Sequence, residues 1–349
     1  MTRATASPGR GVVPVSVTVM RLRWLLLGLL VVALLVPALM ISTARILEPD
    51  GGRWVRLVSF TPYAVVLYAV VMLLLLLAST AGRGPWRGAS AGLSLLLLPL
   101  LGLHLWWASP PYVGAPAGAA AAGETFTVMA SNLLVGGADP ARVVEVALAN
   151  RADLVVLSEI TPTALQRLKA AGLGEALPYT QGEAVAGVSG TMVFSGYPLG
   201  RARPLGRTAG GYEMTVELPQ ATIRLFAVHP RPPVGDAAEW RADHAALRLA
   251  ATAGEGPAVI AGDFNAAMDH RPMRELEGRG FADAAEQARS GWQPTWPAAG
   301  QARVLGIAVP SMLAIDHVLV TEQLVATHTA SVTIPGTDHR AVIANLALR

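Results

Sequence analysis

The spacing of hydrophobic and polar residues along the chain changes once, near residue 125. Before that point, three stretches lack any charged residue: 21 residues between Arg23 and Arg45, 26 between Arg56 and Arg83, and 36 between Arg87 and Glu124. A helix needs about 20 apolar residues to cross the hydrocarbon core of a bilayer. The pattern therefore predicts three membrane-spanning helices, at about 24–43, 60–79 and 89–107.

After residue 125, short apolar runs alternate with amphipathic stretches over about 225 residues, a length that one large domain can fill. The short runs predict strands at 126–132, 153–158, 191–195, 212–218, 222–228, 258–261, 315–320 and 341–346. The longer periodic stretches predict helices at 140–150, 163–171, 236–253 and 271–279. Helices alternate with strands early and strands dominate later, which favours a layered α/β fold with mixed sheets.

These patterns divide the chain into three parts. Residues 1–107 form an N-terminal membrane anchor with the three predicted spans. Residues 108–123 contain Pro, Gly and Ala without charge or periodicity, which is typical of a linker. Residues 124–349 form the predicted α/β domain.

Composition supports a membrane protein and narrows the chemistry. Of the 349 residues, 52% are hydrophobic and only 15% are charged, and the mean hydropathy is +0.45. These values are too apolar for an ordinary soluble protein. The chain has no cysteine, which excludes disulfides, thiolate metal sites and cysteine nucleophiles.

Charge is divided unevenly, and the division predicts how the chain is oriented. Residues 1–121 carry nine basic residues and two acids, whereas the rest carries 18 basic residues and 22 acids. The basic segments without acids are the N-terminal tail and the loop between the second and third spans, which contain Arg3, Arg10, Arg21, Arg23, Arg83 and Arg87. Because such segments stay in the cytoplasm, we expect a cytoplasmic N-terminus and an extracytoplasmic C-terminal domain in the cell membrane.

Polar residues capable of metal binding or proton transfer stand at the ends of most predicted strands. They are Asn132, Glu159, His229, Asp263, Asn265, Asp316, Asp338 and His339. Each residue alone is also an ordinary turn or loop residue. As an ordered set they can converge on one rim of the sheets, where Glu, Asp and Asn oxygens without cysteine suit Mg²⁺ or Mn²⁺.

The order of these motifs resembles the endonuclease/exonuclease/phosphatase superfamily, which is DNase I-like. The matching segments are SN at 131–132, LSE at 157–159, SGYPL at 195–199, HP at 229–230, GDFN at 262–265, IDH at 315–317 and TDHR at 337–340. The preceding anchor resembles the membrane-attached bacterial branch of the superfamily. The resemblance implies a four-layer α/β sandwich with two mixed β-sheets, here preceded by three transmembrane helices. The chain departs from the family pattern at Ser158 and Gly196.

The resemblance also implies roles for the polar residues. Glu159 would be the principal metal ligand, with Asn132 and Asp338 completing the site. Asp263 would position or deprotonate the attacking water, and Asn265 would hold phosphate oxygens. The two histidines that would stabilise the phosphoryl group are His229 and His339, the latter oriented by a hydrogen bond to Asp316. His317 lies next to Asp316 in a strand, so alternation turns it to the other face, where we expect packing.

The residues and the resemblance together favour a membrane-anchored, Mg²⁺- or Mn²⁺-dependent phosphoester hydrolase acting outside the cytoplasmic membrane. The preferred substrate is a phosphorylated or pyrophosphorylated lipid, because the anchor keeps the site near the bilayer and the domain carries excess acid. The first alternative is an exported nuclease, which the cluster of Arg201, Arg203 and Arg207 supports. The second is a catalytically silent module that binds an envelope ligand. The expected partners are the lipid bilayer and the phosphorylated substrate; no obligate protein partner is evident.

Overall fold

The computed structural model describes residues 15–81, 85–113, 125–206, 211–235, 237–298, 300 and 303–349. The chain divides into two compact units. The first comprises Met1–Ser42 and Tyr63–His104, and the second comprises Thr43–Pro62 and Leu105–Arg349. The segment that joins the first two apolar helices therefore belongs to the same unit as the C-terminal residues.

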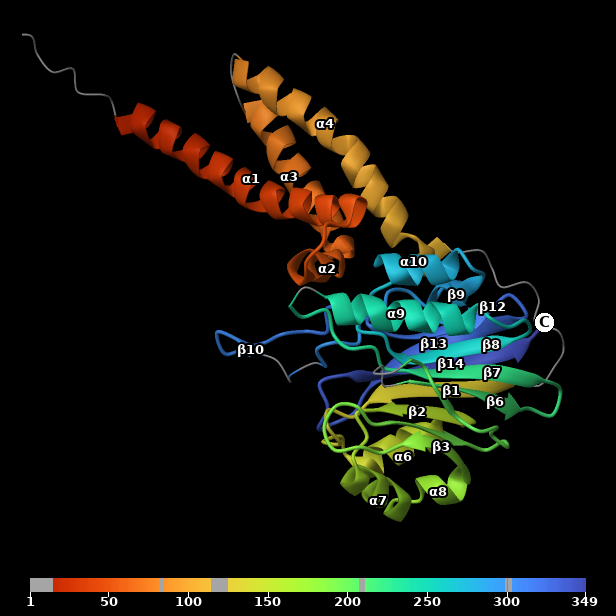
Figure 1. Cartoon of the computed structure of the whole chain (residues 1–349). Helices are drawn as coiled ribbons and strands as arrows, with labels where there is room; N and C mark the ends of the chain where they lie inside the picture. The colour runs from red at the N-terminus through yellow and green to blue at the C-terminus, as the bar shows by residue number, and fades with distance from the viewer. Residues whose placement is uncertain are drawn as a thin grey trace, which may run out of the picture. The chain divides into compact units, whose positions relative to one another are not determined.

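The first unit is built from three long helices, α1 (Val15–Leu47), α3 (Thr61–Ala81) and α4 (Pro85–Ala108) (Figure 1). They contain three segments that are long and apolar enough to cross a membrane, at Leu22–Leu47, Thr61–Ala81 and Trp86–Ala108. Their mean hydropathies are 2.8, 2.5 and 1.7. The three apolar helices agree with the sequence pattern, and each extends a few residues beyond the predicted range.

A buried polar cluster links these three helices. Ser42 Oγ lies 2.6 Å from the hydroxyl oxygen of Tyr68 and 2.9 Å from Nε2 of His104. Each helix thus contributes one polar side chain, and all three residues are buried. Because an apolar environment offers no other partners, mutual hydrogen bonding is the favourable arrangement for these groups.

The second unit contains two six-stranded sheets. The first sheet has the order β13-β14-β1-β2-β4-β3. Its strands are β1 (Thr125–Asn132), β2 (Leu154–Ser158), β3 (Tyr179–Glu183), β4 (Thr191–Ser195), β13 (Leu324–Thr333) and β14 (Arg340–Leu348). Within it, β1 and β2 are parallel and the other pairs are antiparallel.

The second sheet has the order β5-β6-β7-β8-β12-β9. Its strands are β5 (Arg203–Pro204), β6 (Tyr212–Glu217), β7 (Thr222–Val228), β8 (Ala258–Asp263), β9 (Phe281–Asp283) and β12 (Asp316–Thr321). Here β7 and β8 are parallel and the remaining pairs are antiparallel. Both sheets are therefore mixed, as the sequence predicted.

Helices cover the outer face of each sheet. The first sheet is covered by α6 (Pro140–Ala149), α7 (Pro162–Ala170) and α8 (Leu173–Ala176), and the second by α9 (Ala238–Ala251) and α10 (Arg271–Glu277) (Figure 1). A separate hydrophobic cluster fills each interface, and the one between the sheets joins residues such as Val128 and Leu225. The unit is a four-layer α/β sandwich, which confirms the predicted fold class.

The first helices of the sandwich begin where the sequence indicated. The side chain of Asp139 accepts hydrogen bonds from the backbone N–H groups of Ala141 and Arg142, at 3.0 and 3.3 Å. Thr161 caps α7 in the same way, with Pro162 at the first helical position. These caps satisfy N–H groups that have no partner within the helix.

Four short helices and a hairpin complete the second unit beyond the predicted elements. They are α2 (Gly52–Val58), α5 (Pro110–Val113), α11 (Ala284–Gln287), the α8 already described, and the hairpin of β10 (Arg303–Val304) and β11 (Ile307–Ala308). Of the predicted linker, residues 114–123 lie outside the described residues. The division into anchor, linker and domain at residues 107 and 124 stays a prediction.

The segment Thr43–Pro62 is bonded into the second unit. The N–H of Gly52 donates to the carbonyl oxygen of Gly235 at 3.1 Å. Nε2 of His270 lies 2.9 Å from the carbonyl oxygen of Val55, and Arg45 Nε donates to Asp269 at 3.0 Å. Val55 also packs against the cluster beneath α9. The α2 segment is therefore part of the sandwich's surface layer.

Candidate active site

The site lies where strands of both sheets end. In the first sheet, β1 and β2 are parallel, with Asn132 opposite Ser158, so Asn132 and Glu159 project from the same edge. The Asn132 amide donates to Glu159 Oε1 at 3.1 Å and to Asp263 Oδ2 at 3.0 Å. Because Asp263 ends β8 of the second sheet, this single amide joins the two sheets at the site.

The second sheet brings an acid pair and a histidine to the same place. Asp263 on β8 stands directly opposite Asp316 on β12. The parallel neighbour β7 ends one residue before His229, whose Nε2 lies 3.5 Å from Asp263 Oδ2 and 3.7 Å from Glu159 Oε1. His229 therefore faces carboxylates from both sheets.

His339 enters from the loop before β14. Its Nδ1 lies 2.8 Å from Asp316 Oδ2, so the hydrogen bond expected between these residues is present. The other ring nitrogen, Nε2, lies 3.7 Å from Asp263 Oδ2 and 4.0 Å from Asp338 Oδ1. With Nδ1–H donating to Asp316, Nε2 is the nitrogen directed at the centre of the site.

The electrostatics of the site favour charged histidines around an ionised aspartate. Burial opposes protonation of His339, but the carboxylates of Asp316 and Asp263 outweigh it and raise its pKa to about 10. The pKa of His229 is also raised, because Asp263 and Glu159 outweigh the effect of burial. The two histidines in turn lower the pKa of Asp263 despite its burial. Such imidazolium groups suit an anionic phosphoryl group.

The acids of the site fit a divalent cation. Asp338 Oδ2 accepts a hydrogen bond from Trp296 Nε1 at 3.0 Å, whereas Asp338 Oδ1 is buried without a hydrogen-bond partner among the described residues. A buried carboxylate oxygen without a donor is unfavourable unless a cation approaches it. Glu159 places Oε1 in the site while Oε2 accepts the N–H of Val135 at 2.8 Å.

A second grouping of ligand atoms overlaps the first. Asp263, Asp316 and His339 each offer one ligand atom within 4.8 Å of the others. However, His339 donates Nδ1–H to Asp316, and its raised pKa leaves no free lone pair for a metal. The carboxylates are therefore the groups that fit a hard cation such as Mg²⁺, which prefers oxygen ligands.

The GDFN segment needs its glycine and holds its asparagine in a strained conformation. A Cβ added to Gly262 would lie 2.0 Å from the carbonyl oxygen of Val228. Asn265 has φ of 49°, its N–H donates to Asp263 Oδ1 at 2.8 Å, and its amide donates to the carbonyl oxygen of Pro230 at 2.9 Å. One amide proton remains for the expected contact with a phosphate oxygen.

All eight residues that the sequence singled out thus lie in one connected network. His317 is outside it, as alternation predicted: its Nδ1 lies 2.9 Å from Asp283 Oδ2 and its Nε2 lies 3.0 Å from the carbonyl oxygen of Ala266. The roles assigned to the eight residues stay predictions.

Sequence reasoning missed residues that support the site. Trp296 donates to Asp338, and Thr337 Oγ1 donates to the carbonyl oxygen of Asn132 at 2.8 Å and accepts the N–H of His339 at 3.2 Å. Thr295 Oγ1 accepts the N–H of Asp316 at 3.3 Å. None of the three stands in a periodic pattern, and only the position of Thr337 directly before Asp338 gave a signal.

Comparison with known proteins places this site in a family. The model of the Endonuclease/Exonuclease/phosphatase family matches residues 129–339, so the chain belongs to that family. Its members are metal-dependent phosphoric ester hydrolases, and this chain is one of them. No curated protein matches the sequence.

Two solved structures have the same fold. One is an endonuclease/exonuclease/phosphatase from Beutenbergia cavernae DSM 12333, with 20% identity and a TM-score of 0.50, covering 64% of this chain and 72% of that chain. The other is TDP2 of D. rerio complexed with a single-strand DNA product, with 15% identity and a TM-score of 0.52, covering 64% of this chain and 99% of that chain.

Proposed function

We propose that the protein is a membrane-anchored, Mg²⁺- or Mn²⁺-dependent hydrolase that cleaves a phosphorylated or pyrophosphorylated lipid on the extracytoplasmic side of the cell membrane. The observation that carries the proposal is the position of Asp263, between Nε2 of His229 and Nε2 of His339 at 3.5 and 3.7 Å. Three helices able to span a membrane in the same chain support the lipid substrate.

The residues have complementary tasks in this reaction. Asp263, held ionised by the two histidines, orients the attacking water and accepts its proton. His229 and His339 donate hydrogen bonds to phosphoryl oxygens as charge develops on them, and Asp316 fixes the tautomer of His339. When bound to Glu159, Asn132 and Asp338, a divalent ion neutralises charge on the phosphoryl group. No covalent nucleophile is required.

Exposed apolar residues beside the site support a lipid substrate. Trp296, which contacts Asp338, forms an isolated antiparallel bridge with Leu313. The loop between these two residues carries the β10–β11 hairpin, where Leu305 is 97% exposed and Val304 and Ile307 are also exposed. An apolar hairpin tip in water is unfavourable and suits contact with acyl or prenyl chains.

The exported nuclease is the second candidate, and exposed arginines favour it. Arg203 has a 73% exposed side chain, but it already lies 4.0 Å from Glu213. Arg207 lies outside the described residues. The domain's excess of acids opposes binding of a polyanionic duplex. A silent binding module is opposed by the complete network of eight polar residues.

Hydrolysis by the full-length protein in lipid nanodiscs, with and without Mg²⁺ or Mn²⁺, separates these candidates. The substrates are polyprenyl pyrophosphate, a phosphoinositide, sphingomyelin, duplex DNA and RNA. We expect metal-dependent cleavage of a phosphorylated or pyrophosphorylated lipid and little cleavage of nucleic acid. Faster hydrolysis of DNA or RNA would establish the nuclease, and no hydrolysis of any substrate would favour the silent module.

A further inference from the structure

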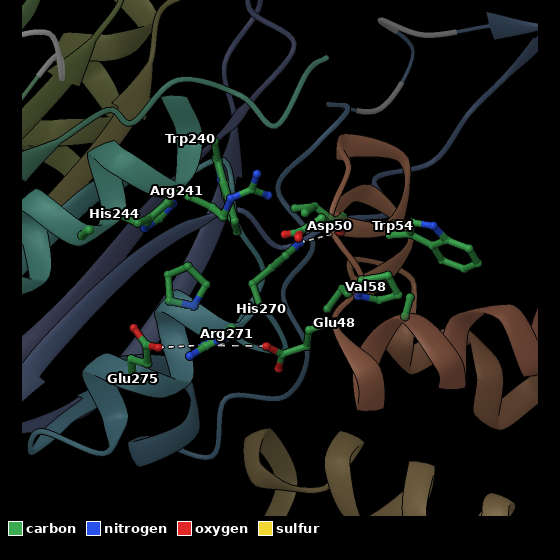
Figure 2. Close-up of a pocket in the computed structure, with 15 residues that line it drawn as sticks. Glu48, Asp50, Trp54, Val58, Trp240, Arg241, His244, His270, Arg271 and Glu275 are labelled. Carbon is green, nitrogen blue, oxygen red and sulfur yellow. Dashed lines mark hydrogen bonds and ion pairs between the residues drawn. The ribbon is translucent and has the colours of Figure 1, made fainter. Parts of the chain in front are cut away.

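A cavity of about 250 Å³ lies in the second unit, away from the residues of the active site. One wall comes from the segment around α2, including Trp54, and the other from α9 and α10, including Trp240 and His244 (Figure 2). The volume is slightly below the range of about 300–1,000 Å³ usual for small-molecule sites. The cavity therefore has room for a small polar group.

His244 gives the cavity an unsatisfied hydrogen-bond acceptor. Its Nε2 lies 3.0 Å from the carbonyl oxygen of Phe264, so Nε2 carries the proton and Nδ1 carries the lone pair. His244 is only 2% exposed, and Nδ1 has no hydrogen-bond partner among the residues that the structure describes. Burial lowers the pKa of His244 to about 3, which keeps the ring neutral. A buried acceptor of this kind favours a ligand that brings a donor.

The other lining groups favour a ligand that donates and carries positive charge. Trp240 uses its Nε1–H on the carbonyl oxygen of Asn265, so only the faces and edges of its ring are available to the cavity. Asp50 lines the cavity and is exposed, and no ion pair involves it within the described ranges. Aromatic rings and carboxylates attract an ammonium group, and a primary ammonium also has the N–H that Nδ1 requires.

The two remaining acids leave less room for a further cation. Arg271 lies 2.8 Å from Glu275 and 3.8 Å from Glu48 across the cavity (Figure 2). These paired charges bound the cavity on one side. The acceptors not used in this way are Nδ1 of His244 and the carboxylate of Asp50.

The sequence positions of the lining residues point to a lipid as the source of the ammonium group. Ala44 belongs to the first membrane-spanning segment, and Val58 lies three residues before the second, which begins at Thr61. Trp54 is of the residue type enriched where chains meet the headgroup region. We propose that the cavity binds the headgroup of a phospholipid that carries a primary ammonium, as phosphatidylethanolamine does, with the ammonium donating to Nδ1 of His244.

Native mass spectrometry of the full-length protein tests this proposal. The protein is released from nanodiscs that contain equal amounts of phosphatidylethanolamine and phosphatidylglycerol, and the retained lipid is identified. One additional hydrogen bond to a buried acceptor corresponds to about a tenfold preference. We therefore expect roughly tenfold more retained phosphatidylethanolamine than phosphatidylglycerol.

Two substitutions on α9 provide a matched pair. Ala245 is exposed and lines the cavity, so Ala245→Trp fills it without touching the bond between His244 and Phe264. Ala242 is exposed on the same helix but does not line the cavity, so Ala242→Trp is the control. We expect the preference to vanish in Ala245→Trp and to persist in Ala242→Trp. Equal melting temperatures of the two variants establish that both are folded.

A soluble arm separates a lipid from a free headgroup. Glycerophosphoethanolamine is added at millimolar concentration, and we expect it to displace the retained lipid only partly. Binding of this compound without any retained phosphatidylethanolamine overturns the membrane source. Equal retention of both lipids by the unaltered protein, or unchanged retention in Ala245→Trp, overturns the site itself. Because retention is measured without turnover, these outcomes are independent of the proposed phosphoesterase reaction.

Discussion

Two acids of the active site differ in what surrounds their carboxylates. Asp316 is buried and its Oδ2 accepts from His339, whereas Glu159 contacts an amide, a backbone N–H and His229. We expect Asp316→Asn to lower kcat by about 10²-fold, the size of a typical general acid–base effect, while metal affinity stays nearly unchanged. The measurement is a metal titration of initial rates on the substrate that the hydrolysis panel identifies.

Glu159→Ala is the contrasting variant for that titration. Loss of a metal ligand should appear first as a higher metal concentration for half-maximal rate, with the fold intact. If Asp316→Asn instead binds metal poorly but turns over normally at saturation, Asp316 is a ligand. The grouping of Asp263, Asp316 and His339 would then be the metal site.

His270 links residue chemistry to stability under acid conditions. Burial lowers its pKa to about 4, below the ordinary value of 6.5. Between these two values the unfolded chain binds more protons than the folded protein, so stability falls as pH falls from 6.5 to 4. A depression of this size corresponds to about 3 kcal/mol when pH reaches the lower value.

The check is thermal unfolding of the full-length protein at pH 7 and pH 4.5, compared with His270→Gln. The glutamine can still donate to the carbonyl oxygen of Val55 but does not titrate. We expect a smaller acid-induced loss of melting temperature in the variant. An identical loss in both proteins would show that His270 does not contribute to acid sensitivity.

At the scale of elements, α2 is held closely against the loop that follows His229. A Cβ added to Gly52 would lie 2.4 Å from the carbonyl oxygen of Gly235 and 2.9 Å from that of Pro233. Because the neighbours are backbone atoms, Gly52→Ala should destabilise the second unit by about 1–3 kcal/mol. Arg53→Ala, an exposed position on the same helix, is the control and should leave the melting temperature unchanged. An unchanged melting temperature in Gly52→Ala would mean that α2 does not pack there.

The strands that sequence patterns predicted are those with continuous apolar burial. The strands β2, β4 and β8 are buried at every position, and their short hydrophobic runs indicated them directly. The ten-residue β13 was missed because it mixes Thr, Ser and His with apolar residues and exposes several of them. Its pairing with the apolar β14 determines the strand, and pairing between distant segments has no local signature.

The site was predictable for a related reason, and its surroundings were not. Asn132 and Asp263 were identifiable because each ends an apolar strand. The contact between Trp296 and Asp338 spans 42 residues, and that between His270 and Val55 spans 215 residues. Such contacts depend on how layers meet in the folded chain, so the sequence offered no pattern for them.

At the scale of the whole molecule, the second unit constrains membrane topology. Its two parts, Thr43–Pro62 and Leu105–Arg349, are separated in sequence by two membrane-spanning segments. Two crossings return the chain to the side from which it left. The bonds from Arg45 to Asp269 and from His270 to Val55 join these two parts and therefore require that both lie on one side of the membrane. An arrangement with only one of the last two helices inserted would break these bonds.

Basic residues predict which side this is. Arg21 and Arg23 before the first span and Arg83 and Arg87 between the later ones have no neighbouring acids, which favours their retention in the cytoplasm. The basic residue Arg45 on the opposite side is paired with Asp269, so it does not oppose this orientation. Alkaline phosphatase fused after Arg349 should therefore be active, and green fluorescent protein fused at the same position should be dark. Moving the fusion point to residue 84, between the second and third spans, should reverse both signals. Fluorescence after Arg349 would place the domain in the cytoplasm and remove the basis for an external lipid substrate.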